Sequence, residues 1–94
     1  MKIIISKDLS EYIERLQFEK MARENLCAFL IRQDLLNTES FEKYHQEYIE
    51  LTTEYELAKN ELENTYIKPM VQEGKNYTWE LDFKTYEVTI HENN

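Results

Sequence analysis

The spacing of apolar residues changes along the chain, and each change predicts a different element. Residues 2–6 form a short β-branched run, which predicts a strand. Asp8 and Glu11 form a D-x-x-E helix start signal, and no residue breaks a helix before about Leu36. We therefore expect a helix over about residues 8–36. The polar stretch at residues 37–40 then supplies capping side chains for a second helix over about residues 39–67.

The second predicted helix carries the most regular pattern in the chain. Its apolar residues recur at alternating steps of three and four, as the a and d positions of a heptad repeat do in coiled coils. These residues, which we call the heptad face, are Phe41, Tyr44, Tyr48, Leu51, Tyr55, Ala58 and Leu62. The heptad face can pack against either of two partners. We expect an antiparallel helical hairpin with the first helix, and a second copy of the chain would add itself as a homodimer.

The first predicted helix is apolar on more than one side. One side holds apolar residues near both ends, with Glu19, Lys20 and Arg23 between them. A different side holds four apolar residues that we call the apolar face: Phe18, Met21, Ala22 and Phe29. Two interpretations are open. Small domains often expose some apolar surface, with long polar side chains at the edge of a thin core. The apolar face is otherwise the binding surface for a partner protein.

The period of the pattern becomes two near the end of the chain. Pro69 ends the second helix after residue 67, with room for one more turn to residue 73. Apolar and polar residues then alternate over about residues 76–91, which predicts a β-hairpin with its turn near residues 84–85. That turn pairs Leu81 with Val88 and Trp79 with Ile90. A lone hairpin is marginal in water, so we expect residues 2–6 to add a third strand.

These elements predict one α+β domain of 94 residues with the order β-α-α-β-β, in which a long antiparallel helical hairpin accompanies a small antiparallel sheet. The chain has one glycine and one proline, which is typical of long regular elements with few turns.

Charge restricts the partners. The formal net charge is −8, from 19 acidic and 11 basic residues, which argues against direct binding of nucleic acid or of an anionic membrane. The second helix carries an acidic face at Glu47, Glu50, Glu54 and Glu61. A solvated surface explains such a face. The alternative is an inhibitor whose acidic face occupies the basic, nucleic-acid-binding groove of a target protein, as a product of a mobile element could.

The sequence offers little chemistry. The single glycine excludes a glycine-rich phosphate loop, and no motif of a hydrolase or metalloprotease is present. Cys27 is the only cysteine and lies in an apolar run, so we expect a core thiol, no disulfide and a cytoplasmic location. The N-terminal apolar run is too short for a signal-peptide core. We expect no catalytic residues and no cofactor.

A metal-binding helical bundle is a remote alternative. Glu42 and His45 have the i,i+3 spacing of di-metal carboxylate proteins, but the first helix offers little beyond Glu19 as a further ligand. We therefore predict no metal site. The sequence favours a non-catalytic protein–protein interaction module or a small structural or adaptor subunit.

Overall fold

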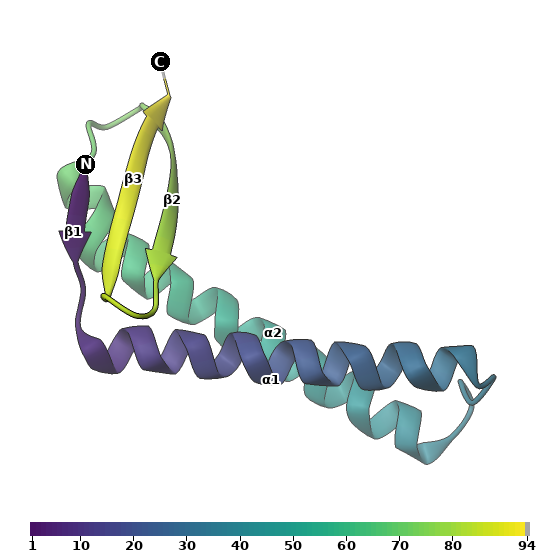
Figure 1. Ribbon diagram of the computed structural model, residues 1–94. Coiled ribbons are helices and arrows are strands. Elements are labelled where there is room, and N and C mark those ends of the chain that lie inside the picture. The colour runs from purple at the N-terminus through teal and green to yellow at the C-terminus, as the bar shows by residue number, and fades with distance from the viewer. Residues whose placement is uncertain (94) are drawn as a thin grey trace. The chain divides into compact units, whose positions relative to one another are not determined.

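The computed structural model describes residues 1–93, and it confirms the predicted α+β class. Two long helices form a hairpin and three strands form an antiparallel sheet, in the order β-α-α-β-β (Figure 1). The chain divides into two compact units. The sheet unit contains residues 1–14 and the chain from Leu57 onwards, and the helical unit contains residues 15–56.

The sheet consists of β1 (Lys2–Ile4), β2 (Asn76–Asp82) and β3 (Glu87–Asn93). β3 lies between the other two strands and pairs antiparallel with both (Figure 1). The predicted cross-strand pairs are confirmed: Leu81 pairs with Val88, and Trp79 pairs with Ile90. β1 is shorter than the predicted strand over residues 2–6, and β3 continues two residues beyond the predicted end of the hairpin.

The loop between β2 and β3 is longer than the two-residue turn at residues 84–85. Both strands stop at the pair Asp82 and Glu87, which leaves four residues between them. The Asp82 carboxylate accepts a hydrogen bond of 2.8 Å from the Lys84 amide, and the Asp82 carbonyl accepts one of 2.9 Å from the Tyr86 amide. Tyr86 has a φ of 60°. A two-residue turn favours glycine or asparagine at left-handed positions, and this sequence has neither there.

Helix α1 (Lys7–Arg32) begins one residue before the predicted start. The Ser6 hydroxyl accepts a hydrogen bond of 3.0 Å from the backbone amide of Leu9. This is the geometry of an N-cap, in which the capping side chain bonds to the third helical amide. Asp8 therefore lies in the first turn of the helix rather than capping it.

Helix α1 ends at Arg32, four residues before the predicted end. Asp34 takes a left-handed conformation with a φ of 59°. The amides of Asp34 and Leu35 donate to the carbonyls of Ile31 and Leu30, over 3.0 and 2.9 Å. These two bonds define a Schellman motif, which usually employs glycine at the left-handed position. Aspartate tolerates that conformation better than most residues, so the stop has no strong signal in the sequence.

Helix α2 (Glu39–Leu62) begins where predicted, because the Thr38 hydroxyl accepts a hydrogen bond of 3.2 Å from the Phe41 amide. Its end differs from the prediction. A π-helical turn (Glu63–Ile67) and a 3-10 turn (Lys68–Met70) follow Leu62. The α-helical pattern cannot pass Pro69, which has no backbone N–H to donate.

The two units differ in how many apolar residues they bury. The sheet unit holds most of the buried apolar residues: Ile5, Ile13, Ala58, Leu62, Ile67, Val88 and Ile90. Within the helical unit, the buried apolar residues among those described are Leu16, Cys27 and Leu30. The helical unit is thus a pair of helices around a thin apolar layer. Neither helix, over the described residues, combines the length and the hydropathy that a membrane span requires.

Candidate functional site

The apolar face of α1 lies in the helical unit and is exposed. Phe18 is 74% exposed, Met21 52% and Phe29 51%, while Ala22 is half-buried. A helix turns by about 100° per residue, which places this face on the side of α1 opposite to Leu16, Cys27 and Leu30. Phe18, Met21 and Phe29 therefore take no part in the core of the helical unit.

The heptad face of α2 is the side of that helix with the least solvent exposure. Its first five residues, from Phe41 to Tyr55, are half-buried and lie in the helical unit. Ala58 and Leu62 are buried and belong to the core of the sheet unit. One continuous sequence pattern thus supplies the inner side of both units.

Two of the polar residues in the middle of the inner side of α1, Lys20 and Arg23, contact side chains of α2. The Arg23 guanidinium donates to the Glu47 carboxylate, and both side chains are half-buried. The Lys20 ammonium lies 5.9 Å from the ring centroid of Tyr48 and 5.5 Å from that of Tyr55, within range of cation–π attraction. The sequence contains the residues for these contacts, namely tyrosines on the heptad face and the basic residues Lys20 and Arg23 on the inner side of α1. The sequence analysis did not predict that they would meet.

The predicted acidic face is not uniform. Glu47 is paired with Arg23, which removes it from the set of freely solvated carboxylates. Glu50 accepts a hydrogen bond of 3.2 Å from the side-chain amide of Gln46, one turn earlier. Glu50, Glu54 and Glu61 are exposed. Three exposed carboxylates therefore remain on this side of α2.

A carboxylate in the sheet unit joins the π-helical turn to β2. The two oxygens of Glu63 accept hydrogen bonds of 3.0 Å each, one from the Tyr77 hydroxyl and one from the Trp79 indole N–H. All three side chains are half-buried. Tyr77 and Trp79 are two residues apart and face the same side of the strand, so both need an acceptor there. The sequence could therefore have indicated a hydrogen-bond acceptor near Tyr77 and Trp79, but the sequence analysis did not predict Glu63.

This arrangement predicts a loss of stability at alkaline pH. Burial raises the pKa of the Tyr77 hydroxyl above its ordinary value of 10.0, and the hydrogen bond to Glu63 and its charge raise the pKa further. The folded state thus favours the neutral hydroxyl. The stabilisation is fully present below pH 10 and is lost as the pH rises through the pKa of the folded state.

We expect Tyr77→Phe to reduce the fall in unfolding free energy above pH 10, measured by urea titration. Tyr44→Phe, which leaves the contact with Glu63 intact, is the control, and an equal change in both variants would contradict the assignment.

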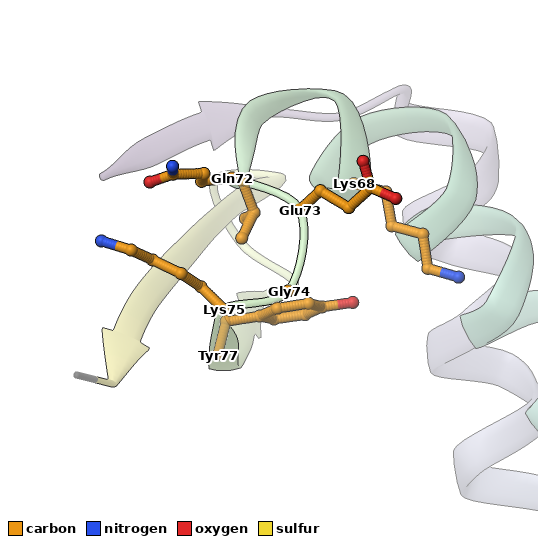
Figure 2. Close-up of a pocket in the computed structure, with 7 residues that line it drawn as sticks. Lys68, Gln72, Glu73, Gly74, Lys75 and Tyr77 are labelled. Atoms are coloured by element: carbon orange, nitrogen blue, oxygen red, sulfur yellow. The ribbon is translucent and has the colours of Figure 1, made fainter.

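A surface depression of about 380 Å³ adjoins Tyr77. It is lined by Lys68, Val71, Gln72, Glu73, Gly74, Lys75 and Tyr77. Figure 2 shows Gln72 and Lys75 extending to one side of the depression and Lys68 to the other. The two lysines and Glu73 are exposed, and the Tyr77 hydroxyl already donates to Glu63. The charges of this depression are therefore solvated, and we assign no ligand to it.

The chemically reactive side chains do not converge. Within residues 1–93, no group of three or more histidine, cysteine, aspartate or glutamate side chains lies close enough to hold a metal ion. The His45 ring stacks on the Phe41 ring, with centroids 5.5 Å apart, and Glu42 is exposed. Cys27 is buried, and burial raises the pKa of its thiol, which disfavours the reactive thiolate.

The apolar face is thus a candidate site, because three large apolar side chains lie exposed on one side of a single helix. On the inner side of α1, polar residues occupy only the middle, between the buried Leu16 and Cys27. The chain shows no significant similarity to any family model, curated protein or solved structure.

Proposed function

We propose that the chain is a non-catalytic, cytoplasmic protein–protein interaction module whose working surface is the apolar face of α1. The observation that carries this proposal is the exposure of Phe18, Met21 and Phe29 on the side of the helix that points away from the core. Exposed apolar area costs about 25 cal/mol per Å², and a bound partner removes that cost. Aromatic residues and methionine are also enriched in protein interfaces.

The thin core of the helical unit supports the same function. Helices in proteins are stabilised mainly by the packing of their apolar sides, and two helices around one thin layer gain little of it. A third element on the outer side of α1 would supply the missing contact. The burial of Cys27 and the stacking of His45 on Phe41 support a non-catalytic role, because neither side chain is placed as a nucleophile or base.

Photo-crosslinking tests the proposal. A benzophenone amino acid at position 18, in the native host cells, should form covalent adducts with a protein that covers the apolar face. The same amino acid at the exposed position 53 of α2 is the control and should form few adducts. Phe29→Asp should abolish the adducts at position 18 and leave the circular dichroism spectrum unchanged. Equal labelling from both positions, or an unfolded Phe29→Asp variant, would refute this function.

The acidic inhibitor is a second candidate, and exposed Glu50, Glu54 and Glu61 support it. The two candidates respond differently to salt. A complex held by these carboxylates should weaken steeply between about 0.05 and 0.5 M salt, because ionic screening shortens to a few ångströms over that range. A complex held by the apolar face should persist. The pairing of Glu47 with Arg23 leaves the acidic face with fewer solvated charges than the sequence suggested.

A further inference from the structure

The two helices differ in net charge, and this difference determines which surfaces of two copies of the chain repel one another least. Helix α1 contains five acidic and five basic residues, so it has no net charge. Helix α2 contains seven glutamates and two lysines. Two copies of a chain with a net charge of −8 repel one another at most orientations. That repulsion is smallest where α1 of one copy approaches α1 of the other.

Four residues on the exposed side of α1 are spaced symmetrically, so that their order of steps is the same in either direction along the helix. Phe18, Ala22, Asn25 and Phe29 follow one another by steps of four, three and four, so they lie along one side of the helix. The two phenylalanines stand about 16 Å apart at the ends of this run, and the two smaller residues stand between them. In an antiparallel pair of such helices, each Phe18 would meet Phe29 of the second copy. The smaller residues at the centre would let the helices approach closely.

Charged residues at the ends of the same side distinguish the two orientations. Glu14 lies one turn before Phe18, and Arg32 lies three residues after Phe29, and both are exposed. An antiparallel pair places Glu14 of each copy near Arg32 of the other, twice by symmetry. A parallel pair would place Glu14 against Glu14 and Arg32 against Arg32. Like charges so placed disfavour the parallel arrangement.

We propose that the partner on the apolar face is a second copy of this chain, bound through antiparallel pairing of the two α1 helices around a two-fold axis near residues 22–25. This inference rests on the proposed function, because it names the occupant of the same face. A single helix pair buries less than the roughly 800 Å² per partner of a standard interface. The dimer is accordingly a reversible one, with a concentration-dependent mass.

Sedimentation equilibrium over a range of concentrations tests the pairing. Phe18→Asp should raise the dissociation constant at least about tenfold, because it replaces two apolar contacts between Phe18 and Phe29, one in each half of the symmetric interface, with buried charges. Glu14→Arg and Arg32→Glu should each raise it about three- to tenfold, since each replaces two attractive pairs with two repulsive ones. The double variant Glu14→Arg, Arg32→Glu should return to within about threefold of the original value.

Glu24→Arg provides the matched control. It reverses one exposed charge on the same helix, but position 24 points to a different side of α1 from Phe18. Its dissociation constant should change by less than about twofold. Circular dichroism on every variant confirms that the helices remain folded.

The outcomes separate this inference from the proposed function. A wild-type chain that stays monomeric at millimolar concentration overturns the dimer, even where the crosslinker at position 18 captures a different protein, and in that case the proposed function stands. A dimer that the double charge reversal fails to restore overturns the antiparallel pairing. A monomer without adducts at position 18 overturns both.

Discussion

Leu62→Ala is expected to lower the free energy of unfolding by about 2–5 kcal/mol. Leu62 is the last residue of α2 and the last of the heptad face, and it is 0% exposed. Removing most of its side chain gives up the transfer free energy of the buried methyl groups and leaves a cavity that a close-packed core refills only in part. A domain of this length is stabilised by roughly 5–14 kcal/mol, so the loss is a large fraction of the total.

Leu57→Ala is the matched control for this prediction. Leu57 stands five residues earlier on the same helix, undergoes the same chemical change and is 63% exposed. We expect its effect to stay within about 0.5 kcal/mol. Both variants can be measured by urea denaturation with the fluorescence of Trp79, the single tryptophan, which reports on the sheet unit. Similar losses for the two variants would mean that Leu62 does not lie in a packed core.

Glu63→Ala is expected to cost about 1–3 kcal/mol, because it leaves the half-buried Tyr77 hydroxyl and Trp79 indole N–H without their acceptor. Hydrogen bonds to a charged acceptor are stronger than those between neutral groups. The loss also removes the side-chain link between the π-helical turn and β2. Glu63→Gln should cost less than the alanine variant, since its amide oxygen still accepts a hydrogen bond.

Glu61→Ala controls for the removal of a carboxylate from the same region. Glu61 is exposed, and its loss should change the unfolding free energy by less than about 0.5 kcal/mol. The assignment also predicts coupling. Tyr77→Phe should cost less in the Glu63→Ala background than alone, because the hydroxyl has already lost its acceptor. Strictly additive effects would show that Glu63 and Tyr77 act independently.

Most of the fold could be predicted because its signals are local. Alternation of apolar and polar residues from Tyr77 to Ile90 specified the two strands, and it specified their register, since a shift by one residue would turn every apolar side chain to the other face. Steps of three and four from Phe41 to Leu62 likewise specified the inner side of α2. These patterns depend on the repeat of the backbone alone, so they can be read without knowing what packs where.

The element ends were predicted less well, because several residues can serve each end. Ser6 and Asp8 are both good capping residues, and the contact that selected Ser6 is a single hydrogen bond to the Leu9 amide. At the other end of α1, Leu35 and Leu36 prolong the apolar pattern past a stop set by the left-handed Asp34. The π-helical turn after Leu62 has no composition that distinguishes it from a continuing α-helix.

The polar contacts were missed for a different reason. Arg23 and Glu47 are 24 residues apart, and Glu63 and Trp79 are 16 apart. Each pair meets only when two elements have settled at a particular offset and rotation. Periodicity identifies which side of an element faces inward, but it leaves undetermined which residue of the neighbouring element stands opposite.

The sequence by itself determined the class of fold, the order of its elements, the register of the hairpin and the presence of apolar residues on two different sides of α1. Only the tertiary structure decided that the outer side stays exposed, that Glu47 is withdrawn from the acidic face by Arg23, and that Glu63 serves both Tyr77 and Trp79. The physical reason is the range of the interactions. Backbone periodicity acts over one or two turns, whereas burial and side-chain pairing depend on elements that are distant in the chain.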